Sequence, residues 1–199
     1  SVDGCLEIKV QGYKNIFCGY YDINPFRPNC PDCLLLHATN LSAYKIPSIS
    51  ESVDLILYDC SSKSWQLIDQ SKTWNWQQGA RLQWLDKNHI AYNVLEEGEV
   101  KCKILNIVNR KYKILPINIS IRKSNKELIS IDYNRLTAAS EYGYRGLKEG
   151  SSSEFVQIYD LETKKIDCLF SWRELKPLKK NGGESEHITH ISVCPSGER

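Results

Sequence analysis

The sequence lacks the local motifs that mark the common nucleotide-binding and hydrolytic enzymes. It contains no GxxxxGK[ST] loop, no GxGxxG after a strand-like run, no GxSxG and no HExxH. A serine cluster at 151–153 has no adjacent histidine that could activate a nucleophile. Any activity must therefore come from residues that the fold brings together.

Long apolar runs and a strong charge of one sign are also missing. No run approaches the roughly 20 apolar residues that span a bilayer, and the first ten residues lack the pattern of a signal peptide. The 26 basic and 24 acidic residues are interspersed and give a formal net charge of +2. Without a large field of one sign, we expect no nucleic-acid and no membrane partner, whereas a small-molecule or saccharide ligand, or a protein partner, fits this surface.

The chain has eight cysteines but little metal-site or disulfide spacing. Most lie in apolar strand-like runs, where a thiol behaves as a small hydrophobe. This favours a reducing, cytoplasmic setting, although a cleaved signal peptide would leave a periplasmic or secreted form open. Only Cys30 and Cys33 are close, in NCPDC, and they supply two of the four ligands of a structural zinc. We interpret this segment as a turn closed by Pro31 and Asp32.

Strand signals dominate what is present. Short runs rich in Ile, Leu, Val, Tyr and Trp are interrupted by Asn, Asp, Ser, Lys or Gly at intervals of roughly 8–12 residues. Few segments have a helical pattern. The hydrophobic content of 41% is sufficient for a core, so we predict an all-β protein.

Three segments align without gaps and indicate an internal repeat. They are LYDCSSKSWQLI from Leu57, ILNIVNRKYKIL from Ile104 and IYDLETKKIDCL from Ile158. Each has an apolar pair, an Asp or Asn, a polar turn and then a large apolar residue, which predicts a β-hairpin whose turn is closed by the Asx side chain. The starts are separated by 47 and 54 residues, a spacing that suits a four-stranded propeller blade.

A second kind of hairpin precedes each repeat. The segments are Tyr20–Leu36, Leu82–Asn93, Ile119–Asp132 and a final start at Ile188–Arg199. We expect a single β-propeller domain over residues 1–199, made of four-stranded antiparallel blades. About three and a half blades are expected, so that the ring is incomplete at its C-terminal end.

Several of these segments resemble the TolB-like six-bladed β-propeller superfamily, whose blades carry a Ser-Pro-Asp-Gly-Lys type of turn. The closest match is VCPSGER at 193–199. More closely, GYYDINPF at 19–26, WNWQQGARLQWL at 74–85 and EHITHISVCPSG at 186–197 resemble a poorly characterised bacterial group related to oligogalacturonate lyases.

The resemblance implies a six-bladed ring with polar residues around a central channel. Oligogalacturonate lyases hold a divalent metal there with His and Gln side chains and cleave an acidic sugar by β-elimination. The corresponding candidates in this sequence are His187 and His190 near one blade start, and Gln77 and Gln78 before another.

Polar residues just before each blade start are the candidates for ligand binding, because the loops leading into the innermost strands line a propeller channel. The predicted ligand-binding residues are Asp22, Gln78, Arg81, Arg135 and His187. Arg81 and Arg135 are placed to clamp a carboxylate or phosphate. The alternative is a salt bridge between blades, with Asp22 or Asp132 as the partner.

His187 and His190 are the candidate metal ligands. On a strand this odd spacing directs the two side chains to opposite faces, so joint ligation requires a bend in the loop. The alternative is a structural or hydrogen-bonding role for one of them. Among the tryptophans, we assign Trp84 to the core and keep Trp74 or Trp76 as candidates for stacking on a sugar ring, with packing between blades as the alternative.

Three functions fit this pattern. The first is binding of a small polar or acidic, carbohydrate-derived ligand in the channel, with no cofactor. The second is a metal-assisted polysaccharide or oligosaccharide lyase or hydrolase that uses a divalent ion. The third is a protein-interaction scaffold without catalysis.

Overall fold

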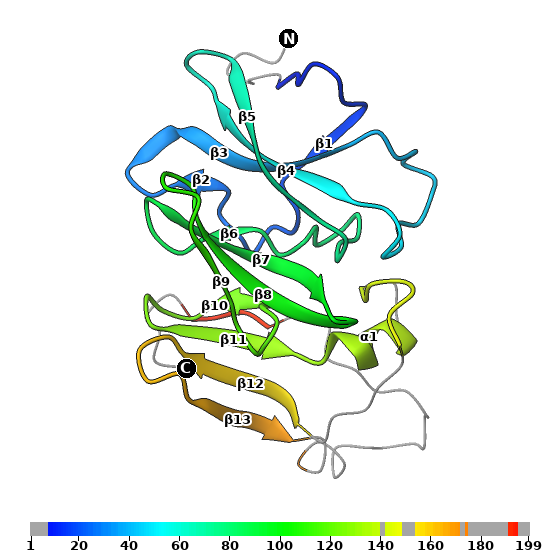
Figure 1. The fold of residues 1–199 in the computed structure, drawn as a ribbon, viewed down its shortest axis with the longest axis vertical. Coiled ribbons are helices and arrows are strands. Elements are labelled where there is room, and N and C mark those ends of the chain that lie inside the picture. The colour runs from blue at the N-terminus through cyan, green and yellow to red at the C-terminus, as the bar shows by residue number, and fades with distance from the viewer. Residues whose placement is uncertain (1–7, 140–141, 149–153, 172–173, 175–190, 195–199) are drawn as a thin grey trace.

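The computed structural model describes residues 8–139, 142–148, 154–171, 174 and 191–194. These residues form three antiparallel sheets that follow one another along the long axis of the molecule (Figure 1). The first sheet contains β1 (Asn15–Phe17), β2 (Phe26–Arg27), β3 (Cys30–Thr39), β4 (Val53–Asp59) and β5 (Ser64–Ser71). The second contains β6 (Gln83–Trp84), β7 (His89–Glu96), β8 (Glu99–Asn106) and β9 (Tyr112–Ile114). The third contains β10 (Ile121–Arg122), β11 (Glu127–Ile131), β12 (Glu154–Asp160) and β13 (Ile166–Ser171). The all-β prediction is confirmed.

In the second and third sheets, strands that are neighbours in sequence pair with each other, and the first sheet follows the same order from β3 to β5. β1 and β2 both pair with the edge of β3 opposite β4, so together they occupy the position that β6 and β10 have in the other sheets. Each sheet thus begins with short pairing segments of two or three residues and ends in a longer outer hairpin. We call β1, β2, β6 and β10 the inner strands.

The three repeated segments are the outer hairpins, as predicted. In each, an Asx side chain closes the turn: Asp59 Oδ1 accepts the N–H groups of Ser61 and Ser62 at 2.9 and 3.0 Å. Asn106 and Asp160 make the equivalent pairs of bonds. The residue four positions after each Asx has a positive φ, at Lys63 (53°), Arg110 (63°) and Lys164 (61°). One turn geometry therefore recurs three times, which explains why the segments align without gaps.

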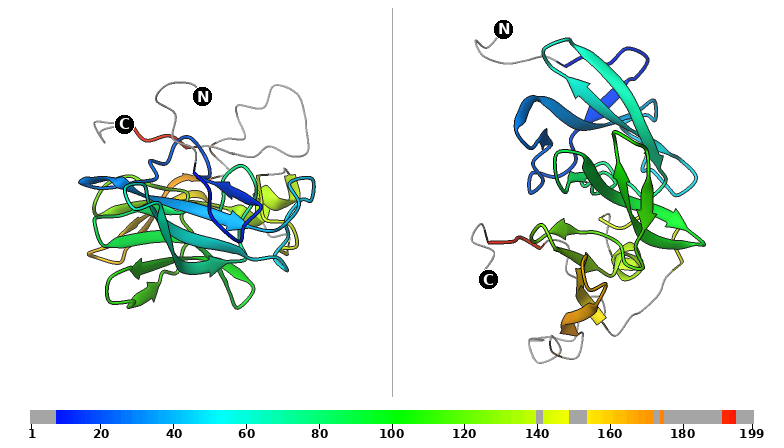
Figure 2. Two further views of the ribbon diagram at one scale, coloured as in Figure 1. Left: turned by 90° about the horizontal axis from the view of Figure 1, so that it is seen from above. Right: turned by 60° about the vertical axis from the view of Figure 1, so that its left-hand side comes forward.

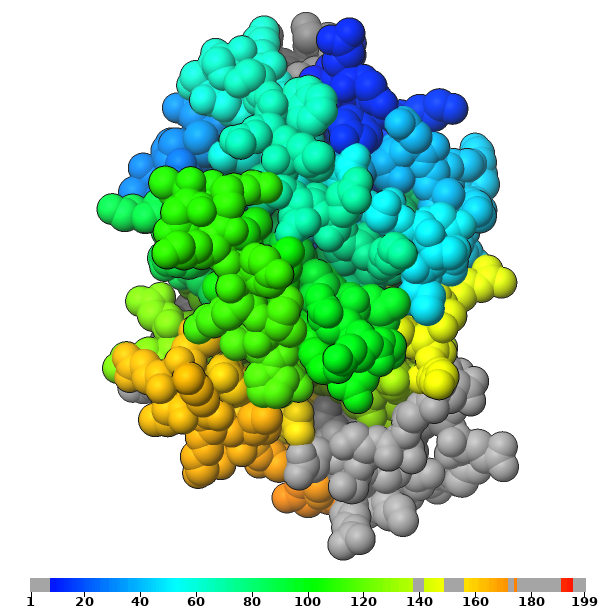
Figure 3. Space-filling view, in the orientation of Figure 1, coloured from blue at the N-terminus to red at the C-terminus, as the bar shows by residue number. Residues whose placement is uncertain are grey.

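The sheets pack face to face through alternating apolar side chains, as period-two strands require. On β7, Ile90 and Tyr92 pack in the cluster that contains Leu55 of the first sheet. The intervening Ala91 belongs to the cluster that contains Leu128 and Tyr159 of the third sheet. The second sheet is thus covered on both faces, and the space-filling view shows the three layers in contact (Figure 3).

Helix α1 (Tyr133–Ala139) was not anticipated from the sequence. Asp132 caps it, because Asp132 Oδ1 accepts the N–H groups of Asn134 and Arg135 at 3.1 Å each. The turned views place the helix at one end of β11, beside the sheets and not between their outer hairpins (Figure 2). No helix in the described part of the chain is long and apolar enough to cross a membrane.

Candidate functional site

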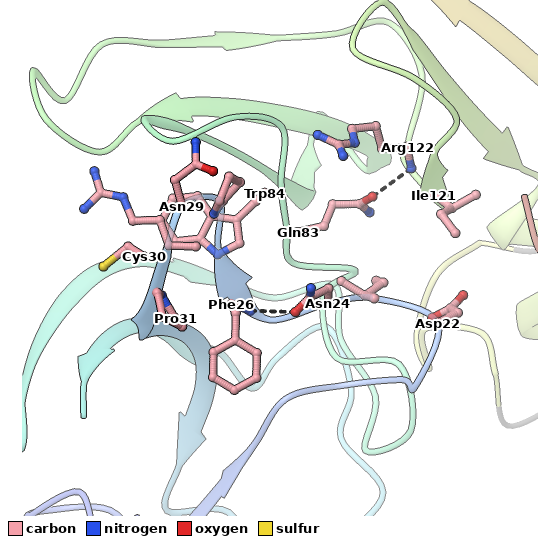
Figure 4. Close-up of a pocket in the computed structure, with 13 residues that line it drawn as sticks. Asp22, Asn24, Phe26, Asn29, Cys30, Pro31, Gln83, Trp84, Ile121 and Arg122 are labelled. Carbon is pink, nitrogen blue, oxygen red and sulfur yellow. Dashed lines mark hydrogen bonds between the residues drawn. The ribbon is translucent and has the colours of Figure 1, made fainter. Parts of the chain in front are cut away.

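A cavity of about 530 Å³ opens where inner strands of all three sheets meet (Figure 4). We call it the inner-strand cavity. Its walls come from the chain around β2, from β6 and from β10, and are made by Asp22, Ile23, Asn24, Phe26, Arg27, Pro28, Asn29, Cys30, Pro31, Gln83, Trp84, Ile121 and Arg122. Asp22 lies at one end and Cys30 at the other. Every sheet contributes polar side chains to this cavity.

Arg81 ties together the segments that lead into the three inner strands. Its Nη2 lies 2.8 Å from Asp22 Oδ2 and its Nη1 3.3 Å from Asp22 Oδ1, which makes a bidentate pair. Its Nε donates to the Ser120 carbonyl at 2.6 Å. The Arg81 and Asp22 side chains are only 2% and 9% exposed. The predicted alternative of a salt bridge between sheets is therefore confirmed, and a ligand could reach Arg81 only by displacing Asp22.

Gln78 lies in a buried polar network next to this pair. The Tyr133 hydroxyl donates to Gln78 Oε1 at 3.4 Å, and the Tyr133 ring stacks on Tyr144 with centroids 4.6 Å apart. Asn93 Nδ2 donates to the Tyr144 hydroxyl at 2.9 Å. Burial raises the pKa of both tyrosines, so they stay neutral. The network anchors α1 to the first two sheets and brings the predicted residues Asp22, Gln78 and Arg81 to one region.

His37 on β3 is fully buried below the loop that carries Gln78. Its Nε2 accepts the N–H of Ala80 at 3.0 Å, and its ring stacks on Phe17 with centroids 4.9 Å apart. Its Nδ1 is buried and makes no hydrogen bond with any described residue. Burial lowers the pKa of His37 from 6.5 to about 4, so the ring is neutral and acts as an acceptor.

This histidine should make folding stability depend on pH. Above pH 6.5 the ring is neutral in both the folded and unfolded states, and its contribution is complete. As the pH falls from 6.5 toward about 4, His37 becomes protonated in the unfolded chain but stays neutral in the folded chain. Proton uptake therefore favours the unfolded state, and the free energy of unfolding decreases. We expect a loss of about 3 kcal/mol over this window, measured by urea denaturation. His37→Gln, which can still accept from Ala80, should flatten the slope between these pH values, and an unchanged slope would contradict the assignment.

The inner-strand cavity carries two arginines whose charge has no acidic partner among the described residues. Arg122 Nη1 donates to the Leu85 carbonyl at 2.5 Å, and Arg27 Nε donates to the Lys87 carbonyl at 2.7 Å. Neither guanidinium forms an ion pair within the described part of the chain, whereas Asp22 is neutralised by Arg81. The cavity therefore has a net positive charge.

Amide and aromatic groups complete the cavity. Gln83, which is buried, uses Oε1 to accept the Arg122 N–H at 2.8 Å and so fixes the backbone of β10 against β6. Asn24 Oδ1 accepts the Phe26 N–H at 3.0 Å, and the Phe26 ring is 46% exposed at the rim. Trp84 is 5% exposed and donates from Nε1 to the Pro25 carbonyl at 2.9 Å. The assignment of Trp84 to the core is confirmed, although its edge also forms cavity wall.

A second cavity, also of about 530 Å³, shares the wall formed by Pro28, Asn29 and Arg122. It contains His89, whose Nδ1 lies 2.8 Å from Asp86 Oδ2 and whose Nε2 lies 3.1 Å from Asn106 Nδ2. Since an amide nitrogen donates, Nε2 is the acceptor and Nδ1 carries the proton. Both nitrogens are thus engaged by turn residues, which gives His89 a positioning role in the β6–β7 turn.

Arg135 lies half-buried on α1, two residues after Tyr133. Side chains two positions apart on a helix do not share a face, so Arg135 leaves the helix in a different direction from Tyr133. Its role in ligand binding stays a prediction. His187 and His190 lie outside the described residues. Among the described residues, no group of three or more His, Cys, Asp and Glu side chains is arranged to hold a metal ion.

The candidate stacking role of Trp74 is wrong. Its side chain is 1% exposed, and its Nε1 donates to the Glu51 carbonyl at 2.8 Å. The ring lies 5.1 Å from that of Trp76 in an edge-to-face contact, and Trp76 in turn donates to the Lys45 carbonyl at 2.7 Å. Both side chains thus attach the loop 74–81 to the connection between β3 and β4.

Most of this chain is similar in structure to part of a solved protein. No protein family model and no curated protein matches this chain. Among solved structures, the chain is similar to the AtxE2 isopeptidase in its apo form, with a TM-score of 0.42 and 12% identity. The similarity covers 84% of this chain and 32% of the isopeptidase chain. The chain therefore spans about a third of the length of the structure that it matches.

Arg27 and Arg122 were missed by reasoning from sequence, which searched the loops before each inner strand and not the strands themselves. The available signal was their position, because each arginine occupies the second residue of a two-residue strand. Such short strands leave their side chains close to the turn, where they can face an opening.

Proposed function

We propose that the three sheets are consecutive blades of a β-propeller of the TolB-like type and that the inner-strand cavity binds a small anionic, carbohydrate-derived ligand. The shared strand order, the recurring outer turn and the meeting of inner strands from all sheets at one cavity support the propeller. The observation that carries the ligand proposal is the pair of guanidinium groups, Arg27 and Arg122, which have no acidic partner among the described residues and lie in a cavity of ligand size.

An anion is favoured because a guanidinium keeps its charge at any physiological pH and matches a carboxylate with parallel donors. Arg122 uses one nitrogen for the Leu85 carbonyl, and its other donors have no partner among the described residues. Arg27 is held over the Trp84 ring, with its Cζ 5.7 Å from the ring centroid, which fixes the direction of its head group. Both positively charged guanidinium groups therefore lie at the cavity, where they can bind an anion.

A sugar acid is favoured over a simple anion because the remaining wall suits a ring with hydroxyl groups. Asn24 and Asn29 supply amides that donate and accept, and the exposed face of Phe26 suits the C–H face of a pyranose. A ligand with one carboxylate and several hydroxyls would use each of these groups. The size of the cavity is also within the range of small-molecule sites.

Titration calorimetry with a uronic-acid disaccharide and a neutral disaccharide tests this proposal. We expect binding of the acidic sugar and a loss of roughly 10- to 100-fold in affinity for Arg122→Gln, because one charge-assisted hydrogen bond is removed. Arg27→Gln should weaken binding less, since its Nε already serves Lys87. Lys111→Gln, which removes the same charge at an exposed position on the outer edge of the second sheet, is the matched control.

Two outcomes would contradict the proposal. Equal affinity for acidic and neutral sugars would show that the arginine charges do not select the ligand. If the parent protein binds neither sugar, the cavity is not a sugar site. If both arginine variants bind the acidic sugar as tightly as the parent protein does, the two arginines are not part of the site. Either result would favour the scaffold function.

A further inference from the structure

The two cysteines that flank Pro31 and Asp32 lie in a bulge of strand β3. The adjacent residues Phe26 and Arg27 of β2 pair with Leu34 and Cys30, so three residues of β3 have no counterpart on this edge. On the other edge the ladder continues, since Cys33 pairs with Asp59. The predicted turn at Pro31 and Asp32 is thus a bulge within a strand.

The bulge changes the distance between the cysteines. In a regular strand, residues three apart are about 10 Å from each other and point to opposite faces. Here Cys30 and Leu34 face neighbouring residues of one short strand, whose Cα atoms are about 3.8 Å apart. Cys33, next to Leu34, is thereby brought closer to Cys30 than a regular strand would allow, and a disulfide needs a Cα separation of roughly 4.4–6.8 Å.

The electrostatics of the two thiols agree with this placement, because Cys30 is among the groups that raise the pKa of Cys33. Burial, followed by Cys30 and the charge of Asp59, raises the pKa of Cys33 to about 11, while Arg27 opposes the rise. Cys33 therefore retains its proton. Cys30, which is part of the cavity wall, is the sulfur that a small reagent can reach.

We propose that Cys30 and Cys33 form a redox-active dithiol in the wall of the inner-strand cavity, which a small disulfide of the glutathione class oxidises to an intramolecular disulfide. This inference does not depend on the identity of the cavity ligand. It adds a site of covalent modification to the wall of the inner-strand cavity, where Cys30 has no role in the proposed ligand binding.

The reaction is balanced without any further reagent. The Cys30 thiolate, after losing its proton to solvent, attacks one sulfur of the oxidant, and a glutathione thiolate leaves. Cys33 then loses its proton and attacks the Cys30 sulfur of the mixed disulfide, and a second glutathione leaves. The protein gives up two electrons and two protons, and one oxidised glutathione becomes two reduced molecules.

Cys102 and Cys60 differ from this pair. Cys102 is fully buried, and burial raises its pKa well above the usual range. Cys60 lies next to the bulge, because its N–H donates to the Asp32 carbonyl at 2.7 Å. It is not part of β3, however, but of the turn between β4 and β5. Cys60→Ser is thus a matched control for a substitution next to the bulge.

Equilibration of the full chain with glutathione buffers, followed by alkylation and mass spectrometry, tests the proposal. Trypsin leaves the Arg27–Pro28 bond intact, so residues 15–45 form one peptide that contains Cys18, Cys30 and Cys33. We expect the peptide to lose two hydrogens on oxidation, with Cys18 still alkylated and the bridge assigned by fragmentation. Cys33→Ser should accumulate a stable glutathione adduct on Cys30, and Cys60→Ser should behave as the parent protein.

Three results would overturn the inference. The first is a parent protein that accumulates the Cys30 adduct without forming the bridge. The second is a bridge from Cys30 to Cys18 or Cys60. The third is full alkylation of Cys30 and Cys33 in oxidising buffers in which the adduct of a free model thiol forms readily.

Discussion

Arg81→Met is expected to lower the free energy of unfolding by about 3–5 kcal/mol, the cost of leaving one member of a buried ion pair alone. Asp22 would keep its charge at 9% exposure without its bidentate partner, and the Ser120 carbonyl would lose the Nε donor. Because Arg81 joins the entries to β2, β6 and β10, the loss should affect the whole stack and not one hairpin. Urea denaturation followed by tryptophan fluorescence measures it.

Two variants define this effect. Arg81→Lys keeps the charge but cannot make the bidentate contact and the third bond together, so it should lie between the parent protein and Arg81→Met. Lys126→Met breaks an exposed pair with Glu162, whose side chains are each 63% exposed, and should change stability by less than about 1 kcal/mol. Equal losses for Arg81→Met and Lys126→Met would contradict the central position of Arg81.

Gly79→Ala is expected to destabilise the fold by about 2–5 kcal/mol. A Cβ atom at this position would lie 2.3 Å from Cε1 and 2.4 Å from Nε2 of His37, whose ring is held by Phe17 and by the N–H of Ala80. Overpacking of this kind typically costs about 1–3 kcal/mol. The φ of 58° adds a further cost of about 1–2 kcal/mol for a residue with a side chain.

Gly98→Ala separates the two contributions. Gly98 also has a positive φ, of 83°, but a Cβ atom there would meet nothing within 4 Å. It should therefore show only the backbone cost, and the difference between the two variants measures the contact with His37. If the two substitutions destabilise equally by chemical denaturation, the ring does not fill the space below Gly79.

The hairpins were predictable from sequence because each is a local structure with a local signal. Asp59, Asn106 and Asp160 bond to N–H groups two and three residues later, and the flanking strands alternate in polarity. These contacts need nothing from the rest of the chain. Helix α1, in contrast, is seven residues long and is stabilised mainly by contacts of Tyr133 and Leu136 in a buried cluster.

The site was predictable only in part, because its geometry depends on contacts between distant segments. Proximity of Asp22 and Arg81 follows from polar residues placed before successive inner strands. Which carboxylate Arg81 would bind could not be read from spacing, since the partner is 59 residues away. Among the described residues, Arg27 and Arg122 have no acidic partner. Whether an arginine has such a partner depends on which residues lie near it in the fold, and no local sequence pattern indicates this.

A crystal structure of the protein with a bound uronic-acid disaccharide tests the central claim most directly. The account predicts the sugar between β2, β6 and β10, with its carboxylate on Arg122 or Arg27 and the Asp22–Arg81 pair intact beside it. A sugar bound at the outer hairpins, or one that occupies the cavity with its carboxylate directed away from both arginines, would contradict it.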